Sequence, residues 1–222
     1  MSSRFYHHKQ TRRRFLWQCA GSALAVGCGS RAGSFYMPPR DPDTLVLYDV
    51  ADPPTLDPAR SWGVLDGRLV GLVFSNLVRF DLQAKMIPDL AQTWSASPDG
   101  LEYTFSLHPG ARFSNGRPIV AEDVRYSFQR VLDPALASSS KWVVERIKEI
   151  AVENDHTIAL RLAEPFAPFL GLLAMPAASI VPREEIERCE KEGIPFGECP
   201  VGGGPWLFRE WRHDQSILFE RN

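Results

Sequence analysis

Residues 94–107 read WSASPDGLEYTFSL, and this stretch indicates the kind of fold that the chain forms. The central Pro98-Asp99-Gly100 has the composition of a tight turn between two strands. From Leu101 to Leu107 every second residue is apolar and the residues between them are polar. Such an alternation gives a strand one buried face and one face in water. The stretch therefore predicts an antiparallel β-hairpin.

Helical and extended segments follow on both sides of this hairpin without a strict strand–helix–strand order. Residues 121–134, AEDVRYSFQRVLDP, are the clearest helix, because acidic residues occupy the first turn and apolar residues recur at helical spacing. Other helices are predicted at 64–78, 167–173 and 183–192, and other strands at 44–50, 147–152, 157–162, 178–181, 205–211 and 216–222. The predicted fold class is therefore α+β, a mixed α/β fold.

The first 27 residues are interpreted as an export signal. A basic head precedes the 13 mostly apolar residues 15–27, whereas a helix that spans a membrane needs about 20 apolar residues. Residues 11–16, TRRRFL, resemble the twin-arginine export motif. Residues 24–28, LAVGC, resemble a lipobox, which would make Cys28 the lipidated first residue of the mature chain. An ordinary signal with a chance cysteine is the alternative.

The charge of the expected mature chain limits its partners. The whole sequence carries a net charge of −2, and residues 1–27 contain basic but no acidic residues, so their removal makes the chain more acidic. An acidic chain is unsuited to nucleic acid, whose phosphates attract Lys and Arg. Contact with a membrane is therefore expected only through the N-terminal lipid. Residues 28–43 are rich in Gly, Pro and Ser and are expected to form a flexible tether.

Two cysteines, Cys189 and Cys199, lie in the body of the expected mature chain. In an oxidising compartment they would form a disulfide that closes a short loop, and two unpaired thiols are the alternative. No histidine lies near either cysteine in the sequence. No metal site is therefore predicted.

The sequence predicts neither an enzyme nor a cofactor. Glu122 and Asp123 resemble a catalytic carboxylate pair, but adjacent residues on a helix diverge by roughly 100°, so compensation of the helix dipole is the better interpretation. Residues 202–205, GGGP, lack the Lys-Ser/Thr of a phosphate loop. No metalloprotease helix, nucleophile elbow or Ser/His/Asp grouping is present. His213 lies in a predicted turn and is expected to face water.

Several motifs occur in the order that one protein family shows. They are LDPARS (56–61), NLVRFD (76–81), the segment 87–134 from IPDLAQTW to FQRVLDP, and PVGGGPWLFREW (200–211). From about Thr44 to Asn222 the chain resembles the extracytoplasmic solute-binding proteins of peptide and nickel ABC importers, known as solute-binding family 5.

The resemblance implies a periplasmic-binding-protein-like lobe with an inserted β-rich subdomain. Residues 44–80 and 176–222 would belong to lobe I, and residues 81–175 would form the insertion. In the family the opposite lobe follows the segment that matches LFERN (218–222), so the second lobe is expected to be missing from this sequence. A truncated product and one part of a split receptor are both consistent with that expectation.

The same resemblance implies a ligand cleft between lobes, with Ser61, Trp62, Gly63 and Val64 on its wall. A Pro-rich loop at this place could offer backbone amides to an extended peptide by strand addition. Trp62 could add a wide apolar contact. Alternatively, Trp62 caps the hydrophobic core and contacts no ligand.

The resemblance also places residues 138–142, with Trp142, and the segment that begins at Met175 near the cleft. Met175 suits adaptable packing against varied side chains. The implied function is that of a lipid-anchored solute-binding component, which presents a peptide-like solute to ABC permease subunits. The alternative is a receptor lobe that acts only through a partner chain, or that has no transport function of its own.

Overall fold

The computed structural model describes residues 51–222, so the export signal, Cys28, the tether and the strand predicted at 44–50 lie outside the described residues. The helices are α1 (Val64–Val73), α2 (Ala121–Leu132), α3 (Phe169–Leu173) and α4 (Arg183–Glu192). The strands are β1 (Val78–Phe80), β2 (Met86–Pro88), β3 (Ala91–Ala96), β4 (Glu102–Leu107), β5 (Ile147–Asn154), β6 (Thr157–Leu162), β7 (Trp206–Arg212) and β8 (Ser216–Arg221). Short 3-10 turns are η1 (Pro58–Arg60), η2 (Lys141–Val143), η3 (Pro176–Ala178) and η4 (Phe196–Glu198).

A four-stranded antiparallel sheet with the order β3-β4-β6-β5 contains the predicted hairpin. Trp94 of β3 lies opposite Phe105 of β4, and Gly100 in the turn has a φ of +70°. A residue with a side chain rarely adopts this left-handed conformation, which explains the glycine. The hairpin and the mixed helix and strand content are confirmed. None of the helices in residues 51–222 is both long and apolar enough to cross a membrane.

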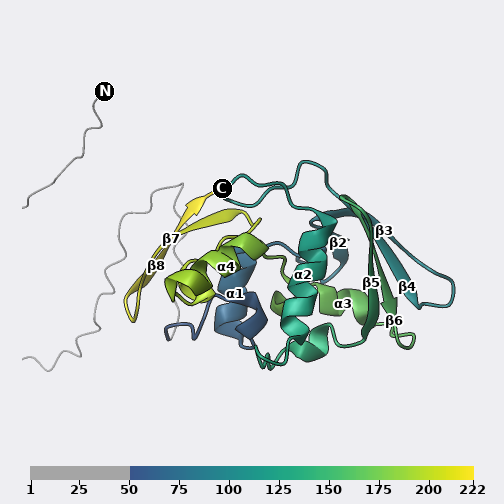
Figure 1. Cartoon of the computed structure of the whole chain (residues 1–222), viewed down its shortest axis with the longest axis horizontal. Coiled ribbons are helices and arrows are strands. Elements are labelled where there is room, and N and C mark those ends of the chain that lie inside the picture. The colour runs from purple at the N-terminus through teal and green to yellow at the C-terminus, as the bar shows by residue number, and fades with distance from the viewer. Residues whose placement is uncertain (1–50) are drawn as a thin grey trace, which may run out of the picture. The chain divides into compact units, whose positions relative to one another are not determined.

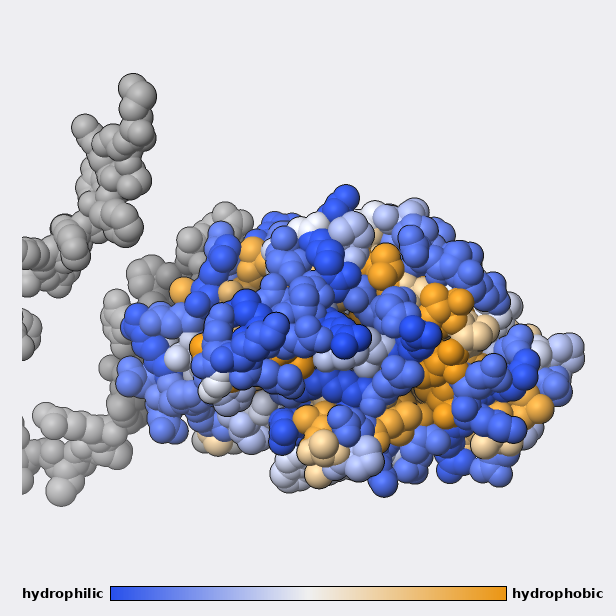
Figure 2. Space-filling view, viewed as in Figure 1, coloured by the Kyte–Doolittle hydropathy of each residue, from blue (hydrophilic) through white to orange (hydrophobic). Residues whose placement is uncertain are grey.

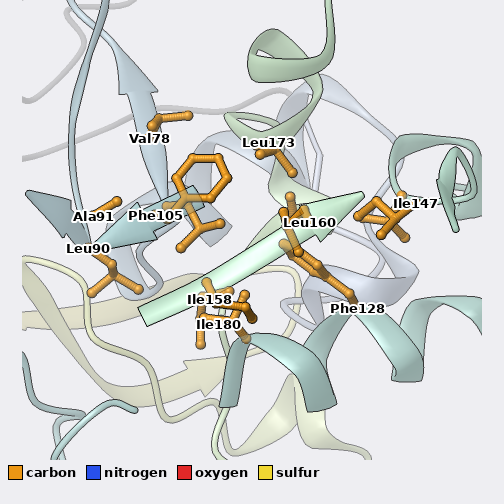
Figure 3. Close-up of a cluster of buried hydrophobic side chains, with 14 of the residues drawn as sticks. Val78, Leu90, Ala91, Phe105, Phe128, Ile147, Ile158, Leu160, Leu173 and Ile180 are labelled. Atoms are coloured by element: carbon orange, nitrogen blue, oxygen red, sulfur yellow. The ribbon is translucent and has the colours of Figure 1, made fainter. Parts of the chain in front are cut away.

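Helix α2 packs beside β5 and covers the apolar face of the sheet (Figure 1). In Figure 3, Phe128 of α2 lies next to Leu160 of β6, and Phe105 and Ile158 belong to the same cluster. All four side chains are fully buried. Replacing a buried phenylalanine with alanine costs about 3–5 kcal/mol in other proteins, so these contacts carry much of the stability of the domain.

One core joins the three ranges that the sequence assigns to lobe and insertion. Leu77, Phe105 and Ile180 come from residues 44–80, 81–175 and 176–222 respectively, and all belong to the main cluster. The boundaries of the lobe and the insertion stay a prediction.

In the view of Figure 2, hydrophilic residues cover most of the surface, and hydrophobic residues show mainly between α2 and β5.

The acidic residues at the start of α2 have separate structural partners. Asp123 accepts a hydrogen bond from the backbone N–H of Val120 at 2.9 Å and one from Arg117 at 2.7 Å. Glu122 pairs with Arg125 on the helix surface. The two carboxylates therefore do not converge, and Asp123 helps to satisfy the free N–H groups at the helix start.

Two predicted elements differ in the structure, for reasons that depend on distant residues. Helix α1 ends at Val73 rather than at residue 78, because the carbonyl of Val73 accepts a hydrogen bond from Gly204 at 2.8 Å. A Cβ atom on Gly202 would lie 2.2 Å from that same carbonyl oxygen, so only glycine permits this approach. The strand predicted at 178–181 is wrong: η3 occupies its start, and Ile180 makes a single backbone bond to Ser75.

The β7–β8 hairpin lies at the opposite end of the described part from the four-stranded sheet (Figure 1). Phe208 and Phe219 of this hairpin pack against a second hydrophobic cluster that includes Val70 of α1. Cys189 of α4 belongs to the same cluster, and the structure joins it to Cys199 in a disulfide. Of the two alternatives that the sequence leaves open, the structure contains the bridge.

Hydrogen bonds between charged or polar side chains also connect the β7–β8 hairpin to other parts of the chain. His213, in the turn between β7 and β8, has Nδ1 at 2.8 Å from Asp52 and Nε2 at 3.2 Å from Glu198. Asp52 in addition accepts a hydrogen bond from Nε1 of Trp211 at 2.9 Å. The prediction that His213 simply faces water is therefore incomplete, because half of its side chain is exposed while both ring nitrogens have partners. The bonds to Asp52 and then Glu198 raise the pKa of His213.

This geometry predicts a pH dependence of stability. A folded-state pKa above the unfolded value of about 6.5 means that His213 stabilises the fold fully below pH ~6.5, and that this contribution is lost as pH rises through the folded pKa. His213→Gln should therefore reduce the free energy of unfolding more at pH 5.5 than at pH 8.5, as measured by urea denaturation. An equal reduction at both pH values would contradict the role of the imidazolium.

Candidate functional site

A pocket with a volume of about 300 Å³ lies where three segments of the chain meet. This volume is at the lower end of the range for small-molecule sites, roughly 300–1,000 Å³. The residues that line it come from the loop between η1 and α1, from η2 and the residues before it, and from η3 with the residue before it. They are Ser61, Trp62, Gly63, Ser139, Ser140, Trp142, Val143, Met175, Pro176 and Ala177.

The structure brings together most of the residues that the sequence singles out. Ser61, Trp62, Gly63, Trp142 and Met175 all line this pocket. Val64, the first residue of α1, is exposed next to it but does not line it. Trp62 is 76% exposed, so it does not cap the hydrophobic core. What these residues bind stays a prediction.

The first wall of the pocket depends on Asp57. One oxygen of Asp57 accepts a hydrogen bond from the N–H of Ala59 at 3.1 Å, which shapes η1 just before Ser61. Two nitrogens of Arg130, on α2, donate to the two oxygens of Asp57, each at 2.7 Å. The exposed fraction is 4% for the Asp57 side chain and 12% for that of Arg130. Burial is the largest influence and lowers the pKa of Arg130, but the hydrogen bonds and the charge of Asp57, with smaller contributions from Tyr126 and Glu190, together raise it above its ordinary value, so the guanidinium stays charged.

The next two residues of this wall are held by Asp66 of α1. Its carboxylate accepts a hydrogen bond from the backbone N–H of Trp62 at 2.9 Å. A Cβ atom on Gly63 would lie 2.7 Å from the other oxygen of Asp66, which explains why glycine stands at this position. The carboxylate is buried, and that second oxygen has no hydrogen-bond partner within residues 51–222.

Two serine hydroxyls join the second wall to the first. Ser138 donates to the carbonyl of Ala59 at 2.6 Å, and Ser140 donates to the carbonyl of Ser61 at 2.8 Å. Because both serines are buried, these bonds replace contacts that the carbonyls would otherwise make with water. The segment with Trp142 is thereby fixed beside Trp62.

A buried asparagine positions the third wall. The side-chain amide of Asn76 donates to the carbonyls of Leu173 at 2.9 Å and Met175 at 2.8 Å. Its oxygen accepts a hydrogen bond from the hydroxyl of Ser179 at 2.8 Å. Asn76 therefore determines where the chain turns after α3, and with it where Met175 lies.

Sequence reasoning missed these supporting residues. Arg130, Asp66 and Asn76 lie on regular elements or next to them. Asn76 and Arg130 fall within the family motifs, but their local pattern does not indicate a role in supporting the pocket. The only available signal was the SSS run at 138–140, which stands directly before the segment of Trp142. Its partners Ala59 and Ser61 are 79 residues away in the sequence, so the pairing could not be read locally.

The pocket can bind a molecule but offers no evident covalent chemistry. Its lining consists of two indole rings, a thioether, small apolar groups, hydroxyls and backbone groups, and includes no charged side chain. Within residues 51–222, no group of three His, Cys, Asp or Glu side chains is placed to hold a metal ion. The arrangement is that of an apolar binding surface with a few polar atoms.

The chain is similar to known proteins of one family. Residues 85–222 match the family model described as "Bacterial extracellular solute-binding proteins, family 5 Middle". The chain is 32% identical over 187 residues to the probable D,D-dipeptide-binding periplasmic protein DdpA of Escherichia coli, a match that covers 81% of this chain and 36% of DdpA. It is 33% identical over 205 residues to di/tripeptide-binding protein 2 of Pseudomonas aeruginosa, covering 82% and 38%.

Solved structures show the same fold. The substrate-binding domain of an oligopeptide ABC transporter from Bacillus anthracis superposes with a TM-score of 0.74 at 26% identity, over 78% of this chain and 36% of that one. DppA from Helicobacter pylori, in complex with the peptide STSA, gives a TM-score of 0.71 at 32% identity, over 78% and 38%. The chain thus spans little more than a third of the length of these relatives.

The buried ion pair beneath the pocket yields a prediction. Arg130→Met should reduce the free energy of unfolding by about 3–5 kcal/mol, because it leaves the Asp57 carboxylate buried without its charged partner. Arg125→Met, on the same helix, breaks only the exposed pair with Glu122 and should cost no more than about 1 kcal/mol. Urea denaturation measures both. Equal losses in the two variants would show that the Arg130–Asp57 pair has no special role.

Proposed function

The chain belongs to family 5 of the bacterial extracellular solute-binding proteins, and we propose that it is the solute-binding component of an ABC importer, which captures peptide-like solutes and delivers them to the permease subunits. Proteins of this family serve transport by binding and are not enzymes. Several relatives are named for the di- or tripeptides that they bind, and one similar structure contains a bound peptide. Peptide-like solutes are therefore the proposed ligands.

The pocket is the observation that carries this proposal. Two exposed tryptophans and Met175 meet there from segments that are far apart in the sequence. Covering exposed aromatic side chains is favourable in water, so a ligand that enters this concave site would gain free energy from them. Backbone groups near Trp62 and Gly63 supply the polar contacts that an extended peptide requires. In the proposed receptor, this pocket forms one wall of a cleft between two lobes.

We also propose that the protein is exported and held at the membrane by a lipid on Cys28. The twin-arginine-like residues 11–16 and the lipobox-like residues 24–28 support this proposal. The relative DdpA is by its name a periplasmic protein. An extracytoplasmic location would also provide the oxidising conditions that the Cys189–Cys199 bridge requires.

Peptide titration tests the transport proposal. Adding an equimolar pool of dipeptides and tripeptides to the purified chain should change the tryptophan fluorescence with saturation and should raise the melting temperature. A ligand at 100 times its dissociation constant stabilises the native state by about 2.7 kcal/mol. Trp62→Ala should weaken binding by about tenfold or more, since a buried aromatic anchor contributes at least ~1.4 kcal/mol.

Leu82→Ala is the matched control, because Leu82 is fully exposed and does not line the pocket. The affinity of the Leu82→Ala variant for the peptide pool should equal that of the unmodified chain. If neither the fluorescence nor the melting temperature responds to any concentration of the pool, the proposal fails for this chain. That result would favour the alternative, in which the lobe acts only through a partner chain.

The lipid anchor has its own test. In cells that express the full chain, Cys28→Ser should abolish acylation and should move the protein from the membrane fraction to the soluble fraction. A single acyl chain gives only marginal membrane affinity, and stable anchoring takes two signals, such as two acyl chains. Cys19→Ser serves as the control and should leave the protein in the membrane fraction. Membrane association that survives the loss of Cys28 would contradict the proposed anchor.

A further inference from the structure

We infer that the pocket between Trp62 and Trp142 receives an aromatic side chain of the solute and disfavours an acidic one. This inference rests on the proposed function, because it names the class of side chain that a bound peptide places in this pocket. Neither the family match nor the named relatives assign such a preference to this chain.

The distribution of tryptophans is the first observation. Residues 51–222 contain five tryptophans, and three of them (Trp94, Trp206 and Trp211) are partly buried. The other two, Trp62 and Trp142, are 76% and 45% exposed, and both line the same pocket. Covering apolar surface contributes about 25 cal/mol per Å². A ligand that covers both indoles therefore recovers the free energy that their exposure costs.

The shape and composition of the pocket indicate which group covers them. Val143 and Ala177 are almost fully buried, and together with Pro176 they give the pocket an apolar base. A volume of about 300 Å³ suits one side chain rather than a whole oligopeptide. An aromatic ring placed there meets a lining that includes both indoles and the sulfur of Met175, and aromatic pairs contribute about 0.5–1.5 kcal/mol beyond the area that they bury.

The charges around the pocket explain the rejection of acidic groups. No charged side chain lines it, so a carboxylate placed there would lose water without gaining a partner. Asp66, whose unpartnered oxygen lies beside Gly63, also offers no positive charge to such a carboxylate. Lys141, the basic residue within η2, is exposed and does not line the pocket.

A matched set of tripeptides tests the inference. Each tripeptide has one variable residue (Phe, Tyr, Leu, Lys or Glu) at the first, second or third position and alanine at the other two. The purified full chain is titrated with each tripeptide by calorimetry. At one position or more, the Phe and Tyr peptides should bind at least about tenfold more tightly than the Glu peptide, and more tightly than the Leu peptide.

Variants show whether this pocket causes the preference. Trp142→Ala should remove the preference for Phe over Leu, and Trp142→Phe should restore it. Phe80→Ala removes an exposed aromatic side chain that does not line the pocket, and it should keep the preference. Circular dichroism and the melting temperature check that each variant is folded. We expect folded variants, because the side chains of Trp142 and Phe80 are both exposed.

The outcomes separate this inference from the proposed function. If trialanine and the other peptides bind but Phe and Tyr give no advantage over Leu, the inference is wrong and the proposed function stands. Tighter binding of the Lys or Glu peptides would overturn it in the same way, as would a preference that persists in Trp142→Ala. If no peptide binds at all, the proposed function fails and the inference fails with it.

Discussion

The paired hydrogen bonds between Arg130 and Asp57 are the constraint on which the pocket depends. Arg130 reaches from the side of α2 that faces the loop, while Phe128 of the same helix is buried against the sheet. A buried ion pair does not by itself guarantee stability, because both charges lose water. Here the pair fixes the position of the loop that carries Trp62 relative to α2. The burial of Phe128 in turn fixes the position of α2 relative to the sheet.

Hydrogen bonds within the chain hold the pocket in place. Each of its three walls is held by side chains that bond to the backbone of another segment: Asp66 to Trp62, Ser140 to Ser61, and Asn76 to Met175. A site that is already ordered loses less conformational entropy on binding, so more of the contact energy appears as affinity. The exposed indoles of Trp62 and Trp142 are attached to this hydrogen-bonded backbone.

Local patterns in the sequence were sufficient for the elements whose stability is local. The turn chemistry at Asp99-Gly100 and the spacing in residues 121–134 predicted β3–β4 and α2. The end of α1 could not be predicted, because a glycine segment far along the chain sets it. The candidate site residues followed from the family resemblance, and their supports did not follow at all, since bonds such as Ser138 to Ala59 join residues that no periodicity connects.

The glycine segment at 202–204 has a consequence for how the protein is made. Its backbone closes the end of α1, and Ser75 donates to the carbonyl of Gly203 from 128 residues earlier in the chain. Chains emerge from the ribosome N-terminus first, and contacts between distant residues form late. The nascent chain therefore lacks these contacts at the end of α1 until the segment 202–204 has been synthesised.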